Sequence, residues 1–338
     1  MGLTDHERRL VLVALAAGLT ACGQPPESFS IVMLPDTLFY SERHPSFFHD
    51  QTKWIAANAE TENIAFVTHV GDIVAHGDAR PEQWRVAREA MERLNGVVPW
   101  GVAIGNHDYD LGDPPGRARA FLENFGPDRF RGRSWYGGAS ANGLNSCQLF
   151  RALGREYLAI HLETDAPDAA ITWAQGVLDR FPGRPAIVTT HVYLSDETGK
   201  HAAESYYRKG SGNSGQQIWD KLVRRNPRIF LVLCGHSSRA GGEAHQISAN
   251  DDGQVVYEIL ADYQKRDHGG SGWLRIIRFH PRENMIQVET FSPPLQRFER
   301  DPSSRFAFFV NFAERFGGSP AKPERAWLFP WQPARLIR

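Results

Sequence analysis

Five places in the sequence share one pattern, in which a short apolar run ends and a side chain able to bind a metal ion or a proton follows. These side chains are Asp36, Asp72, Asn106 with His107 and Asp108, His191, and His236. Carboxylate, amide and imidazole groups in one set suit borderline divalent cations such as Zn²⁺, Mn²⁺ and Fe²⁺. A lone aspartate after an apolar run is usually a turn or a helix cap, but five such places in one chain favour a metal site.

The apolar runs before these residues are predicted to be buried strands. They cover residues 31–34, 64–70, 99–104, 186–190 and 229–233. Helices are predicted between strands, where apolar residues recur every three or four positions, at 47–63, 80–94, 168–181 and 215–225. In an open α/β sheet the ligand cleft lies beyond the carboxyl ends of the strands. The five polar positions are therefore expected to meet at one edge.

The pattern changes after about residue 243. Antiparallel strands are expected at 243–248, 255–260, 272–279 and 285–291, without helices between them. Alternating strands and helices followed by such a run predict an α/β fold with four layers, α/β/β/α, in which helices flank two packed mixed sheets. We expect this domain to cover residues 29–300, and residues 301–338 to be a C-terminal extension whose role the sequence does not define.

The ordered set of polar residues resembles the calcineurin-like metallophosphoesterases over roughly residues 31–291. The family motifs are D-x-H, G-D, G-N-H-D/E, H and G-H-x-H, each after a strand. The corresponding residues are Asp36-Thr37-Leu38, Gly71-Asp72, Gly105-Asn106-His107-Asp108, His191 in TTHVY, and Gly235-His236-Ser237-Ser238. The resemblance implies a metal-dependent hydrolase of phosphate monoesters or diesters, in which a hydroxide that bridges the metals attacks phosphorus.

The resemblance also implies a role for each residue. Asp36 would bind a first cation and Asp72 would bridge the first cation and a second. The side chains that would complete the shell of the second cation are Asn106, His191 and His236. His107 would assist the leaving group and Asp108 would orient His107. The implied cofactors are one or two divalent ions (Mn, Fe or Zn), and the implied partner is a phosphorylated small molecule or macromolecule.

Two residues depart from the family pattern, and both would serve the first cation. Leu38 stands where the family has His or Gln, and Ser238 stands at the second His of G-H-x-H. Three explanations remain open. Another side chain could fill the gap, with Tyr40, His76 and Gln264 as candidates. The enzyme could hold one cation firmly and a second weakly. Alternatively, the chain has lost turnover and binds a phosphorylated ligand in the cell envelope.

The N-terminal residues have the features of an export signal. Arg8 and Arg9 precede a short apolar run that ends in Leu19-Thr20-Ala21-Cys22. The run is too short for a mature membrane-spanning helix, which needs about 20 apolar residues. Residues 1–21 resemble a bacterial lipoprotein signal, with an ordinary cleaved signal or an N-terminal helix as the alternatives. We therefore expect an exported protein anchored to the cell envelope by a lipidated Cys22, with residues 22–28 as a tether.

Charge and the other cysteines place further limits on function. The formal net charge is −1, so no overall positive field indicates specific nucleic-acid binding. Cys147 and Cys234 lie in apolar, strand-like segments, and no CxxC spacing indicates a zinc finger or a redox pair. We expect both to be buried free thiols.

Overall fold

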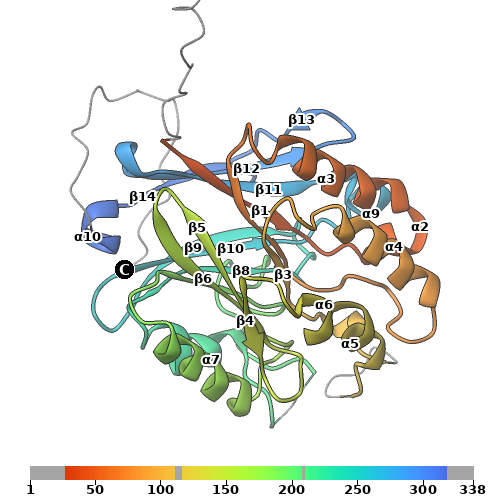
Figure 1. Cartoon of the computed structure of the whole chain (residues 1–338), viewed down its shortest axis with the longest axis horizontal. Helices are drawn as coiled ribbons and strands as arrows, with labels where there is room; N and C mark the ends of the chain where they lie inside the picture. Colours follow the sequence, from red (N-terminus) through yellow and green to blue (C-terminus); the bar gives the residue numbers. More distant parts are fainter. Residues whose placement is uncertain (1–26, 111–115, 208–209, 318–338) are drawn as a thin grey trace, which may run out of the picture.

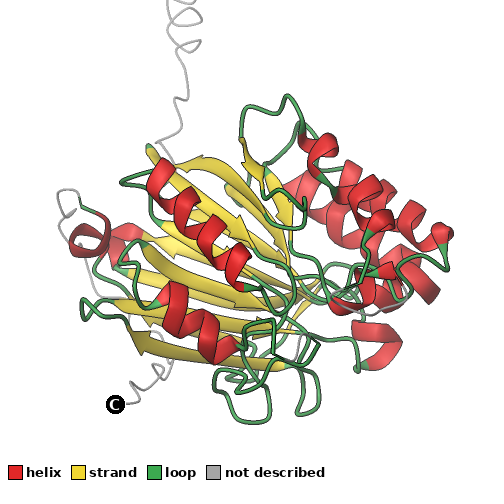
Figure 2. Ribbon diagram, turned by 90° about the horizontal axis from the view of Figure 1, so that it is seen from below, coloured by secondary structure: helices red, strands yellow, loops and turns green. Residues whose placement is uncertain are grey.

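The computed structural model describes residues 27–110, 116–207 and 210–317. Two mixed sheets of seven strands each pack face to face, and helices cover their outer faces (Figures 1 and 2). This arrangement confirms the predicted four-layer α/β/β/α fold. The predicted signal segment, Cys22 and most of the tether lie outside the described residues. Within the described ranges, no helix is long and apolar enough to cross a membrane.

The first sheet has the strand order β13-β12-β11-β1-β2-β3, and β14 pairs with β12. Its strands are β1 (Phe29–Leu34), β2 (Ile64–His69), β3 (Trp100–Val102), β11 (Leu274–His280), β12 (Met285–Ser292), β13 (Arg297–Phe298) and β14 (Arg305–Phe309). The helices on its outer side are α2 (Leu38–Arg43), α3 (Pro45–Asn58), α4 (Pro81–Glu92), α5 (Arg119–Phe125) and α6 (Pro127–Phe130).

The second sheet has the strand order β4-β5-β6-β7-β8-β10-β9. Its strands are β4 (Tyr136–Ala139), β5 (Ser146–Ala152), β6 (Arg155–His161), β7 (Ala186–Thr189), β8 (Ile229–Cys234), β9 (Glu243–Ala249) and β10 (Val255–Ala261). The remaining helical segments are α7 (Asp168–Arg180), α8 (Gly215–Ile218) with the π-turn Trp219–Val223, the 3₁₀ turns Asn106–Asp108 and Pro281–Glu283, α9 (Asp267–Gly270), and α10 (Phe312–Phe316).

The two-residue period of β1 explains the layering. Alternate side chains of a strand point to opposite faces of its sheet. Ile31 and Met33 pack in the apolar core between the two sheets, whereas Val32 and Leu34 pack in the core beneath the helices of the first sheet. A third core, between the second sheet and α7, contains Leu158 and Val188. An apolar strand buried on both faces is what a central strand of a four-layer fold requires.

The C-terminal strands differ from the predicted arrangement. Strands occur near all four expected positions, but β9 and β10 join the second sheet, whereas β11 and β12 join the first. β10 runs parallel to β8. The first sheet also continues past the expected boundary at residue 300, because β14 pairs with β12. Cys147 and Cys234 are buried free thiols, as predicted.

A buried histidine between the two sheets predicts that the folded protein loses stability in acid. His161 is fully buried, its Nε2 lies 2.9 Å from Thr68 Oγ1, and its Nδ1 has no hydrogen-bond partner. Burial lowers the pKa of His161 to about 3. Between pH 6.5 and 3 the unfolded chain therefore binds one more proton than the folded chain, so stability falls as pH falls.

We expect the free energy of unfolding in EDTA to fall by about 2 kcal/mol more for the wild type than for His161→Gln between pH 7 and pH 5. Urea denaturation at the two pH values measures this difference. Glutamine keeps a polar group near Thr68 but does not titrate, so any general effect of acid on the fold is shared by both proteins. Equal losses for the two proteins would show that His161 is not kept neutral by the fold.

Candidate metal centre

The parallel strands of both sheets deliver polar side chains to one edge. β1, β2 and β3 are mutually parallel in the first sheet, and β7, β8 and β10 are parallel in the second. The five predicted polar positions follow β1, β2, β3, β7 and β8. Loops and turns gather at the ends of the strands (Figure 2). The topology thus places the carboxyl ends of strands that are far apart in the sequence at the same edge.

Four of the predicted metal ligands converge around one point. His191 Nε2 lies 3.0 Å from Asn106 Oδ1, 3.2 Å from His236 Nδ1 and 3.3 Å from Asp72 Oδ1. One ligand atom from each of Asp72, His191 and His236 lies within 4.8 Å of the others. Imidazole, carboxylate and amide donors at such separations fit a single borderline divalent cation.

The orientation of His191 makes one ring nitrogen available to a cation. Its Nδ1 lies 3.0 Å from the carbonyl oxygen of Val70, which can only accept a hydrogen bond, so Nδ1 carries a proton and Nε2 is the ring nitrogen left to bind a cation. Burial lowers the pKa of His191, but the charge and hydrogen bond of Asp72 outweigh burial and leave the pKa raised. His191 is therefore fixed with Nε2 toward the ligand cluster.

Two glycines let the loops after β2 and β3 touch. Gly71 has a φ of +101°, and a Cβ there would lie 2.6 Å from the backbone nitrogen of Gly105. A Cβ on Gly105 would lie 2.1 Å from the backbone nitrogen of Asp72. Any larger residue at these positions would push Asp72 away from the loop that carries Asn106. The glycines of the G-D and G-N-H-D motifs thus have a packing role.

Asp36 lies beside this cluster. The backbone N–H of His236 donates to its two carboxylate oxygens at 3.4 and 3.2 Å. The side chain is 1% exposed, and burial raises its pKa well above the usual range, with further increases from the charges of Asp262 and Asp72. Asp36 therefore adds a carboxylate next to the imidazole-containing cluster.

His107 lies at the edge of the cluster. Its backbone N–H donates to Asp72 Oδ1 at 2.9 Å, and its ring Nδ1 lies 3.1 Å from the carbonyl oxygen of Ala75. The same residue lines the adjoining pocket. The contact with Ala75 uses Nδ1, which leaves Nε2 as the ring nitrogen available to a bound molecule.

Asp108 has partners different from those expected. Its Oδ1 accepts from the backbone N–H groups of Ile73 and Val74, and its Oδ2 accepts from that of Gly105, at 2.8 to 3.1 Å. None of these contacts involves the ring of His107. Burial and the charge of Asp72 raise the pKa of Asp108, and the N–H donors offset part of that increase. Asp108 fixes the loop beneath the site, and the Ala75 carbonyl orients His107.

A family model gives the observation that decides the classification. The model described as calcineurin-like phosphoesterase matches residues 30–239, which is more than half of the 338 residues and includes all seven predicted site residues. The chain belongs to the calcineurin-like phosphoesterase family. Membership in this family implies divalent metal ions, and the donors around His191 fit them.

One relative matches most of the chain. The chain is 34% identical over 278 residues to the Bacillus subtilis (strain 168) protein YvnB, described as uncharacterized. The match covers 80% of the chain, and the chain spans only about a fifth (20%) of that relative's length.

Two solved structures share the fold. One is a dimetal phosphatase from Danio rerio, with a TM-score of 0.52, 10% identity, and 83% of this chain and 99% of that chain covered. The other is the purple acid phosphatase PPD1 from yellow lupin (Lupinus luteus) seeds, with a TM-score of 0.54, 13% identity, and 91% and 58% covered. At these identities the likeness concerns the fold alone.

The two departures from the calcineurin-like pattern lie two residues after Asp36 and two residues after His236. Leu38 is the first residue of α2 and is 1% exposed. Ser238 lies in a turn that Asp196 holds by accepting hydrogen bonds from the Ser237 hydroxyl at 2.6 Å and from the backbone N–H of Gly242 at 3.0 Å. The first-cation position thus lacks both imidazoles of the family motif, whereas the second-cation residues are complete.

Of the three side chains considered as substitutes, one reaches Asp36. Gln264 Nε2 lies 3.5 Å from Asp36 Oδ2. The Tyr40 hydroxyl instead accepts a hydrogen bond from a backbone N–H in the loop before β11. His76 is half-exposed and lies 3.5 Å from the carboxylate of Glu42.

Sequence reasoning missed Asp262, which directly follows β10. It is 1% exposed, and its Oδ2 accepts a hydrogen bond from Gln264 Nε2 at 2.7 Å. The signal was present, because residues 255–260 are apolar apart from Glu258 and are followed by an aspartate within two positions. The sequence pattern predicts antiparallel strands here, whereas β10 is parallel to β8 and so ends at the same edge as the other ligand-bearing strands.

A pocket of about 260 Å³ opens over these groups. Its lining includes Asp72, Asn106, His107, Glu197, Tyr206, Tyr207, His236, Ser237, Ser238, Arg239, Gln264 and Lys265. The rings of Tyr206 and Tyr207 lie 5.5 and 5.6 Å from that of His236. The pocket thus joins metal-binding donors at its base to two aromatic rings and two basic side chains.

Proposed function

We propose that the chain hydrolyses phosphate esters at this pocket, with a cation held by Asp72, Asn106, His191 and His236. The observation that carries this proposal is the meeting of these four side chains beside His107. Family membership supports a metal-dependent phosphoester hydrolase. When bound, divalent cations supply Lewis-acid polarisation of a phosphoryl oxygen and a nucleophile at neutral pH.

The proposed role of His107 is to give a proton to the leaving oxygen. Because Nδ1 contacts the Ala75 carbonyl, Nε2 is the ring nitrogen that would carry the proton given to the leaving oxygen. Asp72 also fixes the backbone of His107 by accepting its N–H. The ring is thus positioned before a substrate enters.

The rim of the pocket suits an anionic substrate with a planar group. Arg239 and Lys265 line the pocket and would offset the charge of a phosphate. Tyr206 is 49% exposed and offers a ring face at the mouth. An aryl phosphate matches both features, since its phosphate and ring can use the basic and aromatic sides together.

A second candidate function is binding of a phosphorylated ligand without turnover. It is favoured by Leu38 and Ser238, which remove the two imidazoles expected around the first cation. The intact second-cation residues and the oriented His107 favour hydrolysis. Turnover measurements separate the two functions.

The test is hydrolysis of p-nitrophenyl phosphate and bis(p-nitrophenyl) phosphate by the full chain, loaded in turn with Mn²⁺, Zn²⁺ and Fe²⁺. We expect release of p-nitrophenolate that EDTA abolishes and that metal restores. His191→Ala should remove most of the activity, and His280→Ala, on β11 in the first sheet, should not. A folded, metal-loaded protein that cleaves neither ester would contradict the proposal and favour the binding function.

A further inference from the structure

The two imidazoles of the metal centre lie on two loops that touch each other. His191 lies at the start of the loop after β7, and His236 lies in the loop after β8. The backbone N–H of Gly235 donates to the carbonyl of His191 at 3.0 Å. The two rings then meet, with Nε2 of His191 lying 3.2 Å from Nδ1 of His236. The separation of the two rings therefore depends on how the loops are held together.

The backbone of His236 has a conformation that needs support from its surroundings. Its φ is +69°, in the left-handed region that a residue with a side chain seldom adopts. Such a residue persists where neighbouring contacts determine its position. Asp36 provides one such contact, because it accepts the backbone N–H of His236 at 3.2 Å. Asp196 provides another, because it holds Ser237, the residue that follows His236.

Asp196 forms a second link between the two loops, five residues after His191. One carboxylate oxygen accepts from the Ser237 hydroxyl at 2.6 Å, and the backbone N–H of Asp196 donates to the same hydroxyl oxygen at 3.0 Å. The other carboxylate oxygen accepts from the backbone N–H groups of Ala240 and Gly242 at 2.5 and 3.0 Å. Burial raises the pKa of Asp196, but these hydrogen bonds outweigh burial and leave the pKa lowered. The carboxylate thus binds the loop after β8 at three points.

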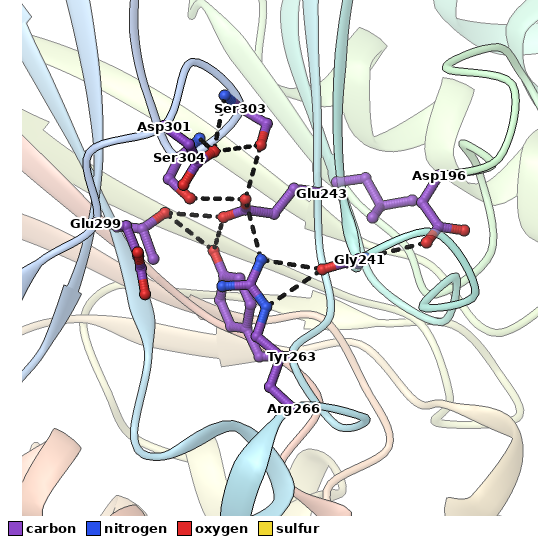
Figure 3. Close-up of polar contacts among 12 residues, drawn as sticks. Asp196, Gly241, Glu243, Tyr263, Arg266, Glu299, Asp301, Ser303 and Ser304 are labelled. Atoms are coloured by element: carbon purple, nitrogen blue, oxygen red, sulfur yellow. Dashed lines mark hydrogen bonds and ion pairs between the residues drawn. The ribbon is translucent and has the colours of Figure 1, made fainter.

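A separate set of contacts holds the end of the same loop. The guanidinium of Arg266 donates to the carbonyl of Gly241 at 3.0 and 3.3 Å, and it lies 3.1 Å from the carboxylate of Glu243 (Figure 3). This contact acts on the loop five residues after His236. Asp196 is the side chain that acts on the residue next to His236, so it has the more direct influence on that ligand.

We propose that Asp196 is a positioning residue for the cation that His191 and His236 hold. It ties the loop after β8 to the loop after β7 and keeps His236 in the left-handed conformation that brings its ring to His191. This inference rests on the proposed metal-dependent function. It assigns the affinity for the cation partly to a carboxylate that acts through His236, as partners that orient metal ligands do.

The test is the Zn²⁺ affinity of the full chain, measured by competition with a chromogenic chelator after removal of metal with EDTA. Asp196→Ala should bind Zn²⁺ at least about tenfold more weakly than wild type, the effect of losing a partner that orients a metal ligand. Asp196→Asn should remain within about threefold of wild type, because its amide oxygen can accept the two backbone N–H groups while its amide nitrogen donates to Ser237.

Asp301→Ala is the matched control. Asp301 holds a turn in the same way, by accepting from the Ser303 hydroxyl and from the backbone N–H groups of Ser303 and Ser304 (Figure 3). That turn precedes β14 and carries none of the predicted site residues. Any general effect of removing a turn-holding carboxylate is shared by the two alanine variants, whereas the Zn²⁺ affinity of Asp301→Ala should equal that of wild type.

A milder variant keeps the proposal testable if Asp196→Ala folds poorly. Ser237→Ala removes the 2.6 Å hydrogen bond and should weaken Zn²⁺ binding by about threefold. Wild-type Zn²⁺ affinity in folded Asp196→Ala, or in Ser237→Ala where Asp196→Ala does not fold, would overturn the assignment. If the wild type hydrolyses esters, that result leaves the proposed function standing. A wild type that binds Zn²⁺ but cleaves no ester would contradict the proposed function alone.

Discussion

Replacing His107 with alanine is expected to lower kcat for alkyl phosphates by roughly 10²- to 10⁴-fold, the range for loss of a general acid. His107 contacts Asp72 only through its backbone N–H, so metal content should not change. Steady-state kinetics with matched metal analysis measures both quantities. The loss should be far smaller for p-nitrophenyl phosphate, because p-nitrophenolate leaves without a proton.

The dependence of the loss in kcat on the leaving group distinguishes a proton donor from a residue that only shapes the pocket. His76→Ala is a suitable control, since His76 is half-exposed and lies near Glu42 in the loop that follows β2. We expect it to retain wild-type kcat for both substrates. Equal losses for alkyl and aryl esters in His107→Ala would exclude His107 as the proton donor.

Asp72→Asn is expected to have the second large effect, because the proposed role of Asp72 is to bridge both cation positions. Its Oδ1 lies 3.3 Å from His191 Nε2 and accepts the backbone N–H of His107. The variant should retain almost no metal after dialysis. It should lose at least about 10³-fold in kcat/KM, which corresponds to about 4 kcal/mol of transition-state stabilisation.

Metal analysis and circular dichroism distinguish this effect from misfolding. Asparagine is isosteric with aspartate, so the fold should remain. Asp179→Asn, on the exposed face of α7, makes the same substitution far from the site and should leave metal content and turnover unchanged. A folded Asp72→Asn variant that retains two cations per chain would rule out a bridging role for Asp72.

The strand-end positions could be predicted from sequence because each depends on local patterns. Short apolar runs such as 229–233 identify buried strands, and the next polar residue is read directly from the chain. The same applies to Gly71 and Gly105, whose close backbone contact accounts for both glycine motifs. The ordering of motifs along the chain then sufficed to predict the fold and the meeting of Asp72, Asn106, His191 and His236.

Features that depend on strand pairing could not be predicted in this way. The sequence of residues 255–261 does not indicate whether β10 pairs parallel or antiparallel with β8. The direction of that pairing decides whether Asp262 lies at the edge where the other strand ends carry polar side chains. The partners of Asp108 also depend on tertiary contacts, because its carboxylate binds backbone groups of a loop more than thirty residues earlier. β14 likewise joins the first sheet only through its pairing with β12.

The most direct test of the metal centre is anomalous diffraction from crystals of the full chain soaked with Zn²⁺ and Mn²⁺. A zinc peak is expected within about 2.0–2.2 Å of donors from Asp72, Asn106, His191 and His236 together. Metal bound elsewhere, or these four side chains directed to separate places in a metal-loaded crystal, would contradict the account.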